Sequence, residues 1–233
     1  MPLLSAETKL CDPILNEPTL IPVINRFGIY LGTGDKSIRT VCEEKGLDCH
    51  FFLTILNTFI DEAYFPEKRL QSFCAAQIVD YLTKTNLYYQ RFQLPNIERH
   101  MNSLIEKSDT DNNNLEWIRK FFIEFKKELL ARIEHDHTVW FPEIMGHYKR
   151  LSQQGKVDDL HLKHRCNEQE EIIEEKLNDL KNLFILHLSG SYDVNLCYAV
   201  IFALYSLEKD IRQHNRIRNR ILQPMSEAMK QIQ

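Results

Sequence analysis

The chain has 233 residues, of which 43% are hydrophobic and 27% are charged, and its formal net charge at pH 7 is −4. This composition supports a buried core, whereas seven glycines and eight prolines are few for a protein rich in β-strands and tight turns. The sequence contains no basic tract and no block of one charge sign, which argues against a nucleic-acid partner.

The cysteines and the N-terminal residues indicate the cellular compartment in which the protein is expected. Six cysteines are scattered along the chain without a CxxC pair, a spacing typical of reduced thiols rather than of a disulfide framework. The N-terminal sequence MPLLSAETKL lacks the basic and apolar regions of a signal peptide. No run approaches the roughly 18 apolar residues of a transmembrane helix. We therefore expect a cytoplasmic protein that has no membrane partner.

Residues 1–68 predict short helices separated by capping and turn residues. Helix starts are indicated by Thr19 before LIPVINRF, by Ser37 in SIRTVCEEK and by Asp48 before CHFFLTILNTFI. The apolar positions of these segments predict a modest core made of Ile21, Ile24, Phe27, Ile38, Val41, Phe52, Ile55 and Leu56. The prediction is a small three-helix domain at residues 1–68, with DEAYFPEKRLQ as the linker that leads out of it.

From about residue 75 the apolar residues recur with the period of long amphipathic helices. Four such helices are predicted, at residues 75–105, 115–148, 160–188 and 194–229. Pro95 is expected to kink the first one. The inward positions of the other three are Ile118, Phe122, Phe125, Leu129 and Val139, then Ile173, Leu177, Leu180 and Phe184, then Val200, Leu204, Leu207, Ile211 and Ile221. Because short loops join the helices, residues 69–233 are predicted to form an up-down four-helix bundle in an all-α protein.

The second and fourth predicted helices end alike, in ARIEHDHTVWFPEIM and QHNRIRNRILQPMSE. In each, polar residues stand ten and six positions before a proline: Arg132 and Asp136 before Pro142, and His214 and Arg218 before Pro224. The members of each pair are four residues apart and continue the inward apolar stripe, so both lie on the inward face of their helix. Polar groups in such a position have to pair with one another or bind a ligand.

This pattern resembles that of the hemerythrin-like di-iron proteins linked to repair of iron–sulfur clusters after nitrosative or oxidative stress. In that family the equivalent helices carry His-x3-Glu before the proline, and the carboxylates bridge two irons. The segment IVDYLTKTNLYYQRFQLPNI is similar to the family's first bundle helix with its LP signature. The segment LCDPILNEPTLIPVINRFGIYLGTGDKSIRTVCEEKGLD is similar to the small domain that precedes the bundle. The resemblance covers nearly the whole chain and implies the same two-part fold.

Most of the iron ligands that the resemblance implies are replaced in this chain. The single histidines fall at Leu87 (or at Asn86, if the register shifts by one), near Lys107 and at Glu170, and the His–Glu pairs fall at Arg132 with Asp136 and at His214 with Arg218. Only His214 keeps its identity, and Asp136 keeps its acidic character. An arginine has no lone pair for a metal, and several cations at one site repel metal ions. We therefore expect no di-iron centre.

A structural role for the substituted positions follows from their charges. Arg132, Arg218 and Lys107 bring positive charge to the place of the iron, while Asp136 and Glu170 bring negative charge. Arginine pairs bidentately with carboxylates, so we predict that guanidinium–carboxylate pairs replace the metal as the link between the helices.

Two functions are consistent with these observations. The first is a non-catalytic binding or regulatory protein without a cofactor, since no arrangement of a nucleophile with a base is found. The sequence does not specify its protein partner. A homodimer is one alternative, but no sequence feature identifies the face through which it would form. The second is a metalloprotein that holds iron or zinc through His214, Asp136 and Glu170 for sensing nitric oxide or oxygen, or for iron donation. The number of lost histidines favours the first.

Overall fold

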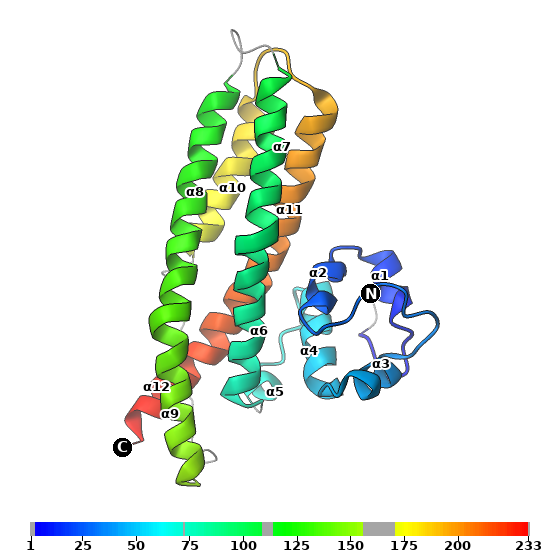
Figure 1. Ribbon diagram of the computed structural model, residues 1–233, viewed down its shortest axis with the longest axis vertical. Coiled ribbons are helices and arrows are strands. Elements are labelled where there is room, and N and C mark those ends of the chain that lie inside the picture. The colour runs from blue at the N-terminus through cyan, green and yellow to red at the C-terminus, as the bar shows by residue number, and fades with distance from the viewer. Residues whose placement is uncertain (1–2, 72, 109–113, 156–170, 233) are drawn as a thin grey trace. The chain divides into compact units, whose positions relative to one another are not determined.

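The structure, a computed structural model, describes residues 3–71, 73–108, 114–155 and 171–232 (Figure 1). All regular elements within these residues are helices, and extended pairing is limited to one bridge between Lys9 and Ser37. The predicted all-α fold class is confirmed. No helix in the described ranges is long and apolar enough to cross a membrane.

The residues form two compact units. Unit 1 comprises Met1–Thr85, Ile144–Arg165 and Arg216–Gln233, and unit 2 comprises Asn86–Glu143 and Cys166–Asn215. These limits differ from the predicted boundary after residue 68, because the chain beyond that point is divided between the units. Unit 1 therefore contains the residues of the predicted small domain together with parts of the predicted bundle helices.

Unit 1 contains short helices and segments of longer ones. The elements that lie wholly within it are α1 (Cys11–Asn16), α2 (Leu20–Asn25), α3 (Ile38–Lys45), α4 (Cys49–Ile60), α5 (Glu67–Gln71), η5 (Arg218–Leu222) and α12 (Gln223–Gln231). It also holds most of α6 (Ala75–Tyr88) and of α9 (Phe141–Gln153). The centre of the first part is α4, where every residue from Phe51 to Phe59 is buried and against which α2 and α3 pack.

The predicted core of residues 1–68 is largely present. Six of its members are buried, namely Ile24, Ile38, Val41, Phe52, Ile55 and Leu56. Ile21 and Phe27 are only partly buried. The sequence analysis missed Val23 on α2. It also missed Phe51, Leu53 and Phe59, because α4 is buried on nearly all sides and not along one stripe.

Side-chain caps explain where two of these helices begin. The hydroxyl of Ser37 accepts a hydrogen bond at 3.2 Å from the amide three residues later, and the carboxylate of Asp48 accepts from two amides of the first turn of α4, at 2.9 and 3.1 Å. Both caps were predicted. Thr19 makes no side-chain capping bond at the start of α2, since its hydroxyl donates to the carboxylate of Glu17. The prediction of Thr19 as a cap is therefore wrong.

Aromatic side chains join the first helices of unit 1 to α6. The ring centroid of Phe27 lies 4.8 Å from that of Phe52 and 5.6 Å from that of Tyr81 on α6. Tyr81 is 2% exposed, and its hydroxyl accepts a hydrogen bond from the guanidinium of Arg26 at 3.2 Å. Each buried aromatic ring removes a large apolar area from water. This packing is the reason that unit 1 extends past residue 68 into α6.

Two arginines near the C-terminus hold the segment that follows α4. The guanidinium of Arg216 donates to the carbonyl oxygens of Thr58 at 2.8 Å and of Glu62 at 2.6 Å. The ring of Phe65 lies 5.1 Å from the guanidinium of Arg216 and 4.6 Å from that of Arg220. A cation near the last carbonyls of a helix is favourable, so Arg216 stabilises the end of α4.

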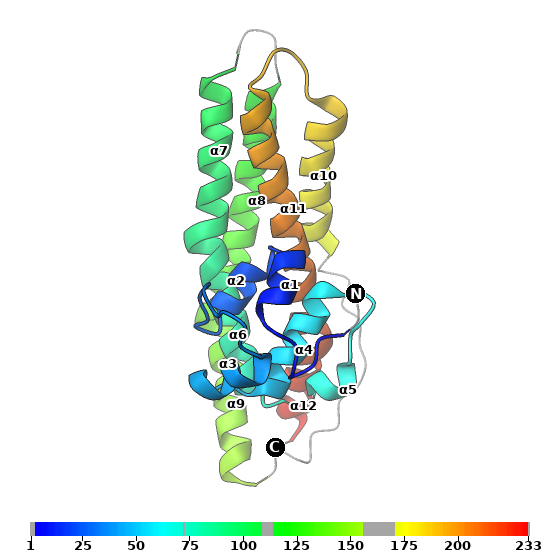
Figure 2. The ribbon, with the colours of Figure 1, turned by 90° about the vertical axis from the view of Figure 1, so that its right-hand side faces the viewer.

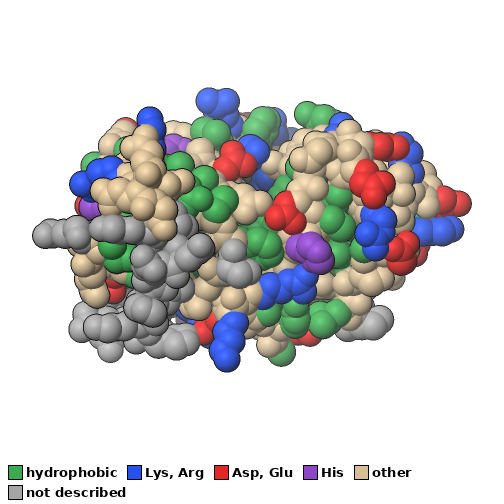
Figure 3. Space-filling model, turned by 90° about the horizontal axis from the view of Figure 1, so that it is seen from below, with side chains coloured by type: hydrophobic (Ala, Val, Ile, Leu, Met, Phe, Trp, Pro, Cys, Tyr) green, Lys and Arg blue, Asp and Glu red, His purple; other side chains and the backbone are tan. Residues whose placement is uncertain are grey.

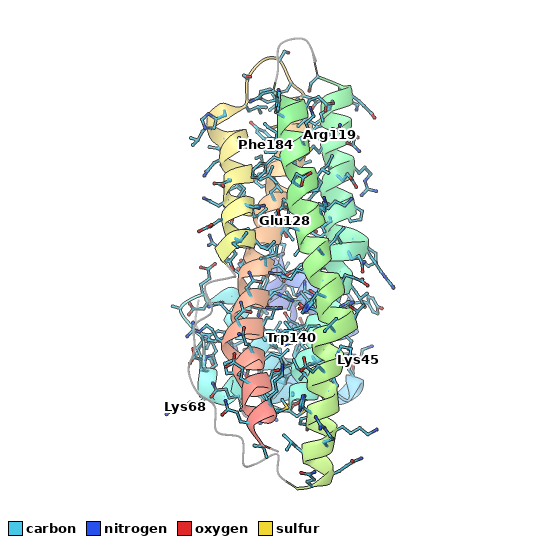
Figure 4. The ribbon with its side chains drawn as sticks, turned by 90° about the vertical axis from the view of Figure 1, so that its left-hand side faces the viewer. Lys45, Lys68, Arg119, Glu128, Trp140 and Phe184 are labelled. Carbon is cyan, nitrogen blue, oxygen red and sulfur yellow. The ribbon has the colours of Figure 1, made fainter. Side chains whose placement is uncertain are left out.

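Unit 2 is built on four helices that run side by side (Figures 1 and 2). They are α7 (Leu94–Glu106), α8 (Leu115–His135), α10 (Glu171–His187) and α11 (Val194–Ile217). Their common core contains the predicted inward residues Ile118, Phe122, Phe125, Leu129, Ile173, Leu177, Leu180, Phe184, Val200, Leu204, Leu207 and Ile211. Each such side chain contributes roughly 1.5–3 kcal/mol when it is fully buried. Nearer the surface, Lys176 of α10 pairs with Glu128 of α8, which is labelled in Figure 4.

Three π-helical segments of the described chain stand at the same distance before a proline. They are η1 (Tyr89–Gln93), η2 (Asp136–Trp140) and η5, and each ends two residues before Pro95, Pro142 and Pro224 respectively. Proline lacks a backbone N–H and clashes with the carbonyl of the preceding turn, and a wider turn accommodates both effects. The disruption predicted at Pro95 takes this form, since α6, η1 and α7 follow one another without a break.

The π turn of η2 moves Val139 to the surface. Val139 was predicted to point inward, but it is 52% exposed, whereas Phe141 is 4% exposed. One additional residue in a turn shifts the helical phase by about 100°. The inward position that follows Asp136 is therefore five residues later, at Phe141, and not three residues later. The prediction for Val139 is wrong because it assumed a uniform helical period.

Candidate functional site

The candidate site is a set of polar side chains inside unit 2. Asp136, the first residue of η2, is 0% exposed, and His214 on α11 is 1% exposed. Arg132, one turn before Asp136 on α8, is half-buried. These three members of the predicted cluster thus lie at positions where polar groups need partners.

Hydrogen bonds between side chains connect three helices of unit 2 at this level. The guanidinium of Arg132 on α8 donates to Oδ1 of Asn215 on α11 at 3.1 Å. The amide nitrogen of Asn215 in turn donates to Oε1 of Glu174 on α10 at 2.8 Å. We call this chain of contacts the Arg132–Asn215–Glu174 relay. The asparagine amide accepts from the cation and donates to the anion, so both charged groups have a partner of suitable polarity.

Sequence reasoning missed two members of the relay. It predicted a carboxylate partner for Arg132 and did not consider Asn215 or Glu174. Each of these residues follows a predicted inward position, since Asn215 comes after His214 and Glu174 after Ile173. That adjacency was the available signal. The pairing itself depends on how far the helices are shifted along one another, which a helical period does not reveal.

His214 packs against the aromatic ring of Tyr89, the first residue of η1. Its ring centroid lies 5.8 Å from that of Tyr89, with the planes at 61° in an edge-on arrangement. Nδ1 of His214 is 3.5 Å from Oδ1 of Asn215, the oxygen that also accepts from Arg132. His214 therefore packs directly beside the relay.

Asn86 is a buried amide one turn before Tyr89. It is 0% exposed, and neither its oxygen nor its amide nitrogen has a hydrogen-bond partner within the described part of the chain. Leu87, the other candidate for the first family histidine, is half-buried. The inward register of this helix is thus the one that contains Asn86. A buried amide without a partner costs roughly 1–3 kcal/mol.

The structure places none of the other three predicted members of the cluster among the described residues in the interior of unit 2. Lys107 is exposed at the C-terminal end of α7, so its prediction as a member of a buried cluster is wrong. The family spacing placed it there, but α7 ends before that position and leaves the lysine in solvent. Arg218 belongs to unit 1, where its guanidinium donates to Oδ1 of Asn219 at 3.1 Å. Glu170 lies outside the described residues.

A second polar contact joins α10 to α11 within unit 2. Nζ of Lys181 lies 2.6 Å from Oε2 of Glu208, and the two side chains are 8% and 9% exposed. Arg212 donates to the other oxygen of Glu208 at 2.8 Å. The ammonium of Lys181 also lies 4.8 Å from the centroid of the Tyr205 ring. The pair is buried and hydrogen-bonded, so removing one partner would leave an uncompensated charge.

A pocket of about 300 Å³ in unit 1 is lined by residues of α9 and α12 and the residues that follow them, among them His147, Arg150 and Lys230. Among the described residues, its lining has cationic side chains but no carboxylate or thiol, so these residues provide neither an acid–base pair of carboxylates nor a set of metal ligands. On the face drawn in Figure 3, positive and negative side chains are interspersed among apolar ones and form no large patch of one sign.

The residues of the candidate site do not fit a di-iron centre. No group of three or more His, Cys, Asp or Glu side chains that could hold a metal occurs in the portion of the chain that the structure describes. Arg132 stands at a position that the resemblance assigns to an iron ligand, and a guanidinium has five N–H donors and no acceptor. What the arrangement can do is connect α8, α10 and α11 through hydrogen bonds of the relay.

Comparison with known proteins returns no match from the models of protein families and none from the curated proteins. The similarity to the hemerythrin-like proteins therefore rests on the sequence motifs alone. The geometry of the polar residues in unit 2 is the remaining basis for an assignment of function.

Proposed function

We propose that the protein is a non-catalytic binding or regulatory member of the hemerythrin-like type, related to the di-iron proteins of iron–sulfur cluster repair. Its architecture is then a small three-helix domain followed by an up-down four-helix bundle. The parallel course of α7, α8, α10 and α11 in Figure 2 supports the bundle. The RFGI and LP motifs, in that order along the chain, support the family.

One observation carries this proposal, namely the Arg132–Asn215–Glu174 relay. It links three of the helices that carry iron ligands in the family, with bonds of 3.1 and 2.8 Å. A hydrogen bond to a charged group contributes roughly 1.5–3 kcal/mol. Two such bonds form a link between helices that needs no metal. The bundle then acts as a scaffold, and the activity of the protein is to bind another protein.

The loop YLGTGDK of the small domain is the surface that we assign to this binding. Tyr30 and Leu31 are 72% and 62% exposed. Gly32 and Gly34 have φ angles of 91° and 59°, a conformation that other residues rarely adopt, so the glycines determine the course of the loop. Large exposed side chains on such loops are typical of binding surfaces.

Metal content tests the proposal. The full chain should be expressed with iron supplied and purified without oxygen, then subjected to elemental analysis and absorption spectroscopy. We expect a folded protein with less than about 0.1 iron or zinc per chain, because Leu87, Arg132 and Arg218 stand at ligand positions and have no lone pair for a metal. A di-iron stoichiometry with the near-ultraviolet bands of an oxo bridge would overturn it.

The second candidate function is a metalloprotein for nitric oxide or oxygen sensing or for iron donation. The burial of both His214 and Asp136 favours it, since these two side chains are potential iron or zinc ligands. This function requires Glu170 as a third ligand. A stoichiometry near one metal per chain, lost in a His214→Ala variant that remains folded, would identify it.

A further inference from the structure

One face of α11 carries large apolar side chains in contact with solvent. Val194, Tyr198, Phe202 and Tyr205 are 49%, 56%, 70% and 45% exposed. Their spacing of four, four and three residues places them on one side of the helix. We call these four residues the aromatic face.

The aromatic face is also free of charge. From Val194 to Leu207 the helix contains no charged residue, although its exposed positions would ordinarily carry charged or polar side chains. The buried side of the same helix supplies Val200 and Leu204 to the core of unit 2. Apolar residues on both sides of a helix indicate that the second side is also covered in the functional state.

The neighbouring elements give the aromatic face a defined border. On one side, the amide of Gln93 donates to the carbonyl oxygen of Ala203 at 3.0 Å, which holds η1 against α11. Phe92 is 64% exposed and stacks on Tyr88 with ring centroids 6.3 Å apart. Toward α10, the ammonium of Lys181 lies over the Tyr205 ring. An apolar centre with a polar rim is typical of protein–protein interfaces.

The exposed area of the aromatic face is large enough for the apolar centre of a protein–protein interface of standard size. With a full side-chain area of about 200 Å² per ring, the exposed fractions of Tyr198, Phe202, Tyr205 and Phe92 leave roughly 500 Å² of aromatic surface in solvent. A stable complex buries about 800 Å² on each partner. The aromatic face with Phe92 therefore supplies most of the apolar centre of such an interface, and its polar rim would complete it.

The spacing of the rings along α11 identifies the partner. If two such helices pack antiparallel with the two-fold axis near Phe202, the Phe202 rings of the two copies face each other, and Tyr198 of each copy lies opposite Tyr205 of the other. Self-complementary surfaces of this kind form two-fold symmetric dimers. The geometry points to a homodimer in which the aromatic faces of two chains pack against each other. This inference does not depend on whether the bundle binds a metal.

The mass of the full chain in solution tests the dimer. Sedimentation equilibrium should give twice the 27.7 kDa of one chain. Phe202→Asp should raise the dissociation constant on the order of 100-fold, because the substitution buries a charge at the centre of the interface twice, once per copy. The matched control is Trp117→Asp, which changes a residue that is 73% exposed on α8 and should leave the dissociation constant unchanged. Circular dichroism of both variants establishes that they remain folded.

Cross-linking tests the antiparallel register. Phe202→Cys lies near the proposed axis and should form a disulfide between two chains under mild oxidation. Val194→Cys lies eight residues away, roughly 12 Å along the helix, and should not pair with its own copy. The wild-type chain gives the background from its native cysteines. A wild-type chain that stays monomeric up to submillimolar concentration, a dimer that Phe202→Asp leaves unchanged, or equal cross-linking of both cysteine variants would each overturn the proposal.

Discussion

Arg132 and Asn86 are polar residues inside unit 2 that differ in their hydrogen bonding. Arg132 donates to Asn215, which donates onward to Glu174, whereas the amide of Asn86 has no hydrogen-bond partner in the described ranges. Loss of a partnered group leaves its partner unsatisfied, but loss of an unpartnered group removes a penalty. Substitutions at the two positions should therefore act in opposite directions.

We predict that Arg132→Met destabilises the protein by about 1.5–3 kcal/mol, because the side-chain oxygen of Asn215 then loses its charged hydrogen-bond donor at 3.1 Å. The measurement is the free energy of unfolding in urea. Arg119→Met is the matched control on the same helix, since Arg119 makes a surface ion pair with Glu116 at 3.0 Å, and it should cost less than about 0.5 kcal/mol (Figure 4). Equal losses in both variants would contradict a specific role of the relay.

For Asn86→Leu we expect an unchanged or increased free energy of unfolding, with a gain of up to about 1 kcal/mol, since an unsatisfied buried amide is replaced by an apolar group. Asn102→Leu on the exposed side of α7 serves as the control and should be nearly neutral. A loss of about 2 kcal/mol at Asn86 would instead show that its amide binds a water molecule or a ligand inside unit 2.

At the scale of single elements, Asp48 determines where α4 begins. Burial by itself would raise the pKa of its carboxyl, but hydrogen bonds from the amide of Phe51, the side chain of Gln77 and the amide of His50 hold the pKa below its usual 3.8. A group with a lowered pKa stabilises the folded state fully above its unfolded pKa. This stabilisation is lost as the pH falls through the folded value.

The prediction from this cap is a pH-dependent loss of stability. At pH 7 the Asp48→Ala variant should unfold with about 1 kcal/mol less free energy than wild type, and Asp48→Asn should lose only part of that, because asparagine also caps helices. The difference between wild type and Asp48→Ala should narrow as the pH falls below 3.8, where the carboxylate becomes protonated. Urea titrations at a series of pH values measure it, and a difference that is independent of pH would contradict the account of the cap.

The phase of the helix after η2 is a second element-scale prediction. Val139→Lys should change the free energy of unfolding by less than about 0.5 kcal/mol, since the side chain is 52% exposed. Leu129→Lys, which places a charge at a position that is 0% exposed, should cost more than about 4 kcal/mol. Thermal or urea unfolding compares the two. A large loss at Val139 would mean that the helix continues without a π turn.

These elements also show what sequence patterns can and cannot predict. The core positions from Ile118 to Leu129 follow a uniform helical period and were predicted because nothing interrupts it. The exposure of Val139 was not predicted, because the π turn that precedes Pro142 adds one residue and changes the helical phase of the residues that follow. Ser37 and Asp48 were predicted as caps from residue type, whereas Thr19 uses its hydroxyl for the neighbouring Glu17.

At the scale of the whole molecule, the division into units and the polar contacts depend on tertiary packing. The sequence indicated a change from short to long helical segments near residue 68. In the structure Tyr81 of α6 packs with Phe27, so most of α6 belongs to unit 1. In the same way, the burial of His214 and Asp136 could be predicted from the inward stripes. The pairing of Arg132 with Asn215 could not, because it requires the relative position of α8 and α11.

A double-mutant cycle on Arg132 and Asn215 tests most directly whether side-chain contacts link α8 to α11. The variants Arg132→Met, Asn215→Leu and the double substitution are unfolded in urea with and without added ferrous iron under anaerobic conditions. We predict a coupling free energy of at least about 1 kcal/mol between the two positions and no effect of iron on wild-type stability. Zero coupling, together with stabilisation of the wild type by iron, would contradict the relay and indicate that a metal holds the helices.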